Sequence, residues 1–122
     1  MSPEEILSYP SKVLSDEQRE YYFRYGFVGV KNLVPKETLN KLKGVTNQFV
    51  EKSREVSESN NVFDIGPGHS KDAPILRRLK SPDENHDEYW NFSTGLMADV
   101  ASDLVGPNVT FHHSKLNFKW YD

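Results

Sequence analysis

The chain has 122 residues, of which 36% are hydrophobic and 27% are charged, and its formal net charge at pH 7 is −3. This length allows one domain at most, and a mean hydropathy of −0.70 argues against a large independent core. The mild negative charge excludes a general basic surface for nucleic acid, and the lack of cysteine excludes disulfides, thiol nucleophiles and zinc–thiolate sites.

The N-terminal residues form no apolar run of signal-peptide length, and no stretch of the sequence approaches a membrane span. We therefore expect a cytoplasmic protein that does not bind a membrane. Residues 1–14 are polar and interrupted by proline, which favours an irregular lead-in. Residues 15–122 are expected to belong to one domain.

Two helices are predicted in the first half of the chain. The first begins after Ser15, which opens a Ser-Asp-Glu-Gln capping box, and ends at Gly26. Residues 27–30 should follow it as a short buried strand. The second helix begins at Pro35 and ends near Ser53, because leucine, valine and phenylalanine recur along it at helical spacing.

The second half of the chain is predicted to open with a long loop over residues 55–73, which are rich in Ser, Asn, Asp and Gly. Residues 74–79 should form a short helical or extended piece. A third helix is expected from Tyr89 to Leu104, since apolar residues recur every three or four positions. The Gly-Pro-Asn sequence at 106–108 should end it.

Residues 111–122 are predicted to form a strand with two unlike faces, because side chains alternate along a strand. Its polar face would carry His113, Lys115, Asn117 and Lys119. Its other face would carry His112, Ser114, Leu116, Phe118 and Trp120. Such a strand needs a packing layer and backbone partners, so we expect the sequence to be cut within a domain. Helices followed by this strand indicate an α+β fold.

The histidines are the candidate metal ligands, and we interpret each as structural. His112 and His113 should point to opposite faces of a strand, and His69 belongs to a Gly-Pro-Gly-His sequence typical of a turn. The sequence His86-Asp87-Glu88 matches half of an iron-binding triad, but acidic residues are also expected where a helix begins. We therefore predict no metal ligand and no catalytic residue, leaving as an alternative a site formed by His86, Glu88 and a later histidine.

Basic residues give a stronger indication of binding. Arg77, Arg78 and Lys80 lie on one short segment, and Lys115 and Lys119 share a face of the last predicted strand. Cationic donors of this kind are the usual partners of carboxylates, so together they could bind a small dicarboxylate. The alternative is a solvated positive patch.

Three stretches occur in a particular order along the chain. They are residues 14–28, with Leu-Ser-Asp-Glu-Gln and Tyr-Gly-Phe-Val; residues 76–82, Leu-Arg-Arg-Leu-Lys-Ser-Pro; and residues 103–119, with Asp-Leu-Val-Gly-Pro-Asn-Val and His-Ser-Lys-Leu-Asn-Phe-Lys. In this order they resemble the N-terminal part of the phytanoyl-CoA dioxygenase family. The resemblance spans roughly residues 14–119 and covers less than half of a family member.

This resemblance implies an Fe(II)- and 2-oxoglutarate-dependent oxygenase, built on a jelly-roll or cupin-like double-stranded β-helix, that hydroxylates a small organic substrate. It assigns Lys80, Lys115 and Asn117 to the 2-oxoglutarate pocket. The His-x-Asp, the distant His and the Arg that hold iron and 2-oxoglutarate in the family find no counterpart in this sequence. We therefore expect the helical layer and first strands of a truncated domain, inactive alone and holding neither cofactor.

A rival interpretation is a non-catalytic α+β module that binds a partner or oligomerises through an exposed strand edge. The family does not fix the substrate, because one fold and cofactor serve different acceptors. The oligomeric state is left open.

Overall fold

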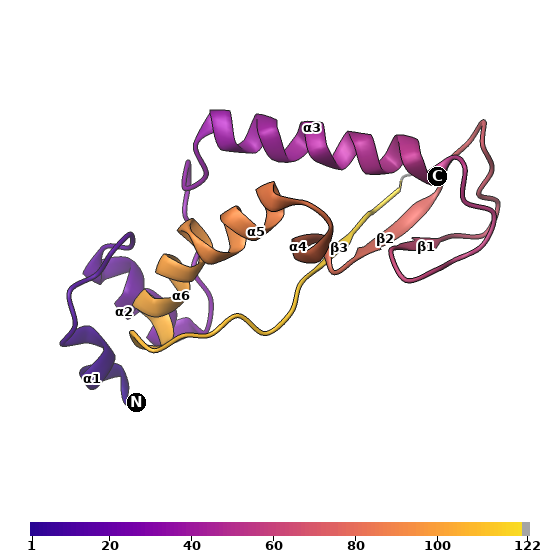
Figure 1. Ribbon diagram of the computed structural model, residues 1–122. Helices are drawn as coiled ribbons and strands as arrows, with labels where there is room; N and C mark the ends of the chain where they lie inside the picture. The colour runs from indigo at the N-terminus through magenta and orange to yellow at the C-terminus, as the bar shows by residue number, and fades with distance from the viewer. Residues whose placement is uncertain (121–122) are drawn as a thin grey trace. The chain divides into compact units, whose positions relative to one another are not determined.

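The computed structural model describes residues 1–120 and has a mixed α+β fold, which confirms the predicted class (Figure 1). Helices and strands are interleaved along the chain. Their order is α1 (Pro3–Leu7), α2 (Asp16–Tyr25), α3 (Lys36–Ser53), β1 (Phe63–Ile65), β2 (Leu76–Lys80), α4 (Pro82–Asn85), α5 (Asp87–Thr94), α6 (Leu96–Val105) and β3 (Lys115–Asn117).

The chain folds into two compact units, which we describe separately. The N-terminal unit comprises Met1–Pro35 and Asn91–Phe111. The sheet unit comprises Lys36–Trp90 and the described residues from His112 onward. The single domain that we expected over residues 15–122 therefore contains parts of both units.

The N-terminal unit begins with two capped helices. Ser15 accepts a hydrogen bond from the Gln18 N–H and α2 ends at Gly26, whose φ of 81° is left-handed, as predicted. The prediction that residues 1–14 are irregular is wrong at α1. Ser2 and Glu5 form a capping box there, and Pro3 occupies the first turn. The five residues of α1 are too few to show helical periodicity in the sequence.

Residues 27–30 do not form the predicted buried strand. No sheet pairing involves them, and Phe27 is 61% exposed. The Phe27 ring instead meets the Tyr21 ring edge-on, at 5.6 Å between centroids. Four apolar-rich residues are therefore not enough to specify a strand where no partner strand is supplied.

The predicted third helix is divided at Gly95 into α5 and α6. A Cβ atom at Gly95 would lie 2.7 Å from the Asn91 carbonyl oxygen, so the break depends on glycine. Within the N-terminal unit, α6 contacts both α1 and α2, and Ile6, Leu14 and Val100 are buried there. The periodicity therefore located the helical residues but not the interruption.

The sheet unit contains a three-stranded antiparallel sheet in the order β1-β2-β3 (Figure 1). β1 lies inside the predicted long loop, and β2 resolves the ambiguous segment as extended. One face of the sheet packs against α3, where Val45, Phe49, Leu79 and Tyr89 form the buried core. Burying only one face of an antiparallel sheet leaves the other free for polar side chains.

The predicted final strand is shorter than expected, because only Lys115–Asn117 pair as β3. The chain nevertheless continues beside β2. The Phe118 N–H donates to the Arg77 carbonyl at 2.9 Å, and the Trp120 indole N–H donates to the Leu76 carbonyl at 2.7 Å. Residues 121 and 122 of the predicted strand lie outside the described residues.

Over residues 1–120, none of the helices combines the length and the apolar character needed to cross a membrane.

Candidate functional site

The register of the sheet separates an apolar row from a polar row. Leu79 of β2 lies opposite Phe63 of β1 and Leu116 of β3, and these three side chains belong to the core side of the sheet. The neighbouring row places Arg78 opposite Asp64 and Asn117. Since directly opposed residues share a face, these polar side chains lie on the face turned away from the core.

Lys80 and Lys115 form the next cross-strand pair on this polar face. They are directly opposed in the β2–β3 register. The Lys80 ammonium group also donates a hydrogen bond to the Asn60 carbonyl oxygen at 2.8 Å. Like charges at directly opposed positions destabilise a sheet, so this pair has an unfavourable interaction that an anion between the ammonium groups would relieve.

A bulge adds another cation to the same face. Asp64 pairs with Arg78 while Ile65 pairs with Leu76, so Arg77 is an extra residue on β2. Leu76 and Leu79 are both fully buried although they are three residues apart. The bulge therefore lets both leucines reach the core and leaves Arg77 and Arg78 together on the polar side.

These side chains surround a hollow of about 240 Å³, lined by Asp64, Arg77, Arg78, Asn117, Phe118 and Lys119. Its lining contains three cationic side chains and one carboxylate. An Arg78 guanidinium nitrogen lies 3.2 Å from an Asp64 carboxylate oxygen, and this ion pair holds Arg78 against the sheet. The remaining positive charge of Arg77 and Lys119 makes the hollow suitable for an anion.

The three residues assigned to a cofactor site from the sequence occupy adjacent positions in this arrangement. Lys80 opposes Lys115, and Asn117 lies two residues further along β3 on the same face. Asn117 also lines the hollow, whereas the two lysines do not. The sequence did not indicate Asp64, which lay in a predicted loop, or the bulge, which has no local sequence signal.

The histidines do not form a metal centre within the described part of the chain. Among residues 1–120, no three His, Asp or Glu side chains come close enough to hold one ion. His69 accepts a hydrogen bond from the Ile75 N–H at 2.8 Å, and its other ring nitrogen lies 2.9 Å from the Ser53 carbonyl. His69 therefore stabilises the turn that contains it by hydrogen bonds to Ile75 and Ser53, which agrees with the predicted structural role.

His86 also has a structural role. Its Nδ1 accepts a hydrogen bond from the Glu88 N–H at 3.0 Å where α5 begins, which confirms the interpretation of His86-Asp87-Glu88 as a helix start. His112 and His113 were expected on opposite faces of a strand. They precede β3, however, and their rings meet edge-on with centroids 4.4 Å apart, so that expectation is wrong.

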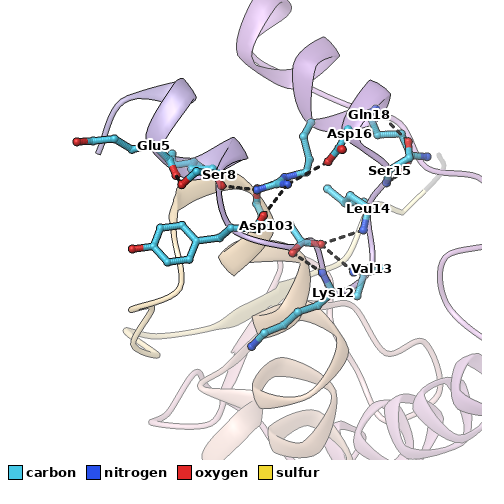
Figure 2. Close-up of polar contacts among 12 residues, drawn as sticks. Glu5, Ser8, Lys12, Val13, Leu14, Ser15, Asp16, Gln18 and Asp103 are labelled. Atoms are coloured by element: carbon cyan, nitrogen blue, oxygen red, sulfur yellow. Dashed lines mark hydrogen bonds and ion pairs between the residues drawn. The ribbon is translucent and has the colours of Figure 1, made fainter.

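A second polar cluster, in the N-terminal unit, centres on Asp103. This side chain is buried, and its carboxylate accepts hydrogen bonds from the backbone N–H groups of Lys12, Val13 and Leu14 at 2.8–2.9 Å (Figure 2). Burial by itself would raise the pKa of the Asp103 carboxyl. The three N–H donors and the positive charge of Arg19 outweigh burial and lower that pKa below its ordinary value.

The buried Arg19 guanidinium completes this cluster. It donates to the Asp103 carbonyl at 2.9 Å, to the Ile6 carbonyl at 2.6 Å and to the Tyr9 carbonyl at 3.1 Å, and it pairs with Asp16 at 3.2 Å. Every polar atom of the Arg19 side chain has a protein partner. We therefore interpret the cluster as structural, although perturbed carboxyl groups often mark functional sites.

Comparisons with protein-family models, with curated proteins and with solved structures give no match for this chain.

Proposed function

We propose that this chain is the N-terminal part of an Fe(II)- and 2-oxoglutarate-dependent oxygenase of the phytanoyl-CoA dioxygenase type. The proposal follows the sequence resemblance, and one structural observation supports it. That observation is the direct opposition of Lys80 and Lys115, two residues that the resemblance assigns to the 2-oxoglutarate pocket. They come from segments 35 positions apart in the sequence, and the sheet brings them to one face.

The described residues fit 2-oxoglutarate better than they fit iron. Two carboxylates suit a face that carries Lys80, Lys115 and the cations of the adjoining hollow, and the Asn117 amide can donate a further hydrogen bond. Residues 1–120 offer no group of three side chains that could hold an ion. We therefore propose that the iron ligands belong to sequence that is not in this chain.

In the proposed enzyme, bound iron and 2-oxoglutarate supply the oxidising chemistry for hydroxylation of a small organic substrate. The residues of this chain bind and orient. Lys80 and Lys115 would hold one carboxylate of 2-oxoglutarate between their ammonium groups, and Asn117 would fix its orientation. Because the carboxylate compensates the positive charge of both ammonium groups, its binding relieves the repulsion between the two lysines. This relief contributes to the free energy of binding.

The sheet also suits extension into a jelly-roll. In the described residues β3 pairs only with β2, so its second edge is available to another strand. Half-buried Leu116 and Phe118 already pack on the core side, while Trp120 is 48% exposed and stacks on Phe118. We propose that additional strands of a double-stranded β-helix pair with this edge in the complete, cytoplasmic enzyme.

The experiment is an isothermal titration of the whole chain with 2-oxoglutarate, with acetate as the monocarboxylate comparison. Stable cofactor binding requires the remaining ligands, so we expect only weak, millimolar binding that salt abolishes. Changing Lys80→Gln or Lys115→Gln should each weaken it roughly two- to fivefold, because an exposed ion pair contributes about 0.5–1 kcal/mol.

The matched control is Lys41→Gln, which removes an exposed lysine of α3 that pairs with Glu37 in the same unit. This change should leave the affinity unaltered. Equal weakening by Lys41→Gln, or unchanged affinity after loss of both Lys80 and Lys115, would reject the proposed pocket.

The open β3 edge favours a second candidate, an oligomerisation or binding module without catalytic activity. In that case two copies would pair edge to edge. Sedimentation velocity distinguishes the candidates: a dimer that persists at micromolar concentration and does not respond to 2-oxoglutarate supports the module.

A further inference from the structure

An open hollow of about 400 Å³ lies on the N-terminal unit, where α2 and the segment after it meet. It is lined by Glu17, Gln18, Tyr21, Phe27, Val28 and Gly29. None of these residues belongs to the polar sheet face described above. The hollow is therefore a separate feature, and its role is independent of the proposed oxygenase function.

Two exposed aromatic rings form the walls of this hollow. The Tyr21 and Phe27 rings are perpendicular, with centroids 5.6 Å apart, and their residues are 43% and 61% exposed. Gly26 creates this corner, because its left-handed conformation ends α2 and turns the chain so that Phe27 returns toward Tyr21. Large aromatic side chains left together at a surface commonly mark a binding site.

The electrostatic character of the lining favours a cationic ligand. Glu17 contributes a carboxylate, and none of the six lining residues is positively charged. Aromatic faces carry negative electrostatic potential and attract cations. The neighbouring ring already does so, since the Arg24 guanidinium carbon lies 5.3 Å from the centroid of Tyr25, whose ring packs 4.6 Å from that of Tyr21.

The same lining favours a methylated cation over a bare ammonium ion. Tyr21, Phe27, Val28 and Gly29 contribute two aromatic rings, an aliphatic group and backbone, whereas side-chain acceptors come only from Glu17, Gln18 and the Tyr21 hydroxyl. A primary ammonium group would exchange strongly bound water for few acceptors. A trimethylammonium group has no N–H donor to satisfy and fits apolar walls.

We propose that this aromatic corner binds small molecules that carry a trimethylammonium group. The probe is choline, and its matched control is 3,3-dimethylbutan-1-ol, which has the same shape but a neutral carbon in place of nitrogen. Titration of the whole ¹⁵N-labelled chain should give saturable shift changes for the amides of residues 17–29. The neutral isostere should bind about fivefold more weakly, because a cation–π contact at an exposed site contributes up to about 1 kcal/mol.

Variants identify the residues responsible. Phe27→Leu and Tyr21→Leu should each weaken choline binding about threefold or more, and Glu17→Gln should weaken it by a smaller factor. Tyr9→Leu removes an equally exposed tyrosine outside the hollow and should leave the affinity unchanged. All four positions are at the surface, and preserved amide dispersion verifies that each variant is folded.

Three results would overturn the proposal. They are linear, non-saturating shifts; equal binding of choline and its neutral isostere; and undiminished choline affinity in folded Phe27→Leu.

Discussion

The N-terminal unit buries two charged side chains, Asp103 and Arg19, whereas the sheet unit carries its cluster of charged side chains on the exposed polar face of the sheet. The Asp103 carboxylate accepts hydrogen bonds from backbone N–H groups of the same unit. The Arg19 guanidinium donates to backbone carbonyls there, including the carbonyl of Asp103. Lys80 and Lys115 oppose each other across two strands, and Arg77 and Lys119 line a hollow. The buried charges of the N-terminal unit are already compensated by partners within that unit, whereas Arg77 and Lys119 on the sheet leave positive charge that is available to an anion.

The largest effect expected from this comparison concerns Asp103. Asp103→Ala should destabilise the chain by about 3–5 kcal/mol, because it leaves three backbone N–H groups without their acceptor and removes the carboxylate charge that acts on the buried Arg19. Urea unfolding followed by circular dichroism measures the change. The control is Asp99→Ala, which removes an exposed carboxylate 3.6 Å from Lys12 and should cost less than about 1 kcal/mol.

The lowered pKa of Asp103 also implies that acid destabilises the N-terminal unit. Because its folded pKa lies below the ordinary 3.8, its ionised form contributes stability that is complete above pH 3.8 and is lost as pH falls through the folded value. The protection factors of the amides of residues 12–19, which compare the measured exchange rate with the intrinsic rate at the same pH, should therefore fall below pH 3.8. Unchanged protection of these amides there would contradict the structural role of the cluster.

The next largest effect tests the sheet unit through its apolar core. Leu79→Ala should cost about 3 kcal/mol, because Leu79 is fully buried among the side chains of α3, β1 and α5. Leu39→Ala is the control, since Leu39 is 40% exposed and its truncation leaves no cavity. Similar unfolding midpoints for the two variants would mean that the α3–sheet core is not formed as described.

A smaller effect concerns Tyr89, whose hydroxyl lies 2.7 Å from that of Thr46. Burial raises the pKa of Tyr89, and the Thr46 hydrogen bond only partly offsets it. Stability from the neutral phenol is therefore complete below pH 10.0 and is lost as pH rises through the folded value. Tyr89→Phe should cost about 1 kcal/mol at neutral pH and flatten the stability profile above pH 10.0.

Features that depend on a local sequence pattern could be predicted from the sequence. The capping box at Ser15, the Gly26 terminator and the helix ending at Ser53 depend on local patterns, and the structure confirms them. Residues 27–30 and the long third helix were predicted wrongly. Strand formation needs a partner distant in sequence, and the break at Gly95 depends on one backbone approach.

The candidate site shows the same limit. Alternation along the last strand correctly put Lys115 and Asn117 on one face, but their relation to Lys80 depends on strand register. The contribution of Arg77 depends on a bulge, and that of Asp64 on a three-residue strand inside a polar segment. Register and bulges are properties of paired strands, so one segment read alone does not reveal them.

The smallest expected effect has an unusual sign. Lys115→Gln should stabilise the folded chain by about 0.5 kcal/mol, because it removes the like-charge opposition to Lys80. The same variant should bind carboxylates more weakly. Lys119→Gln, outside that cross-strand pair, should not stabilise the chain. Equal stabilisation by both variants would assign the effect to the positive charge of the whole polar face and would contradict the specific role of the Lys80–Lys115 pair.

The proposed 2-oxoglutarate site is tested most directly by an amide shift map of the whole chain titrated with 2-oxoglutarate. We expect saturable shifts confined to β2, β3 and residues 118–119, with none at residues 12–19 around the Asp103 cluster. The proposed site is ruled out if no saturable shifts occur, or if the shifts lie around Asp103 and Arg19 and leave Lys80 and Lys115 unaffected.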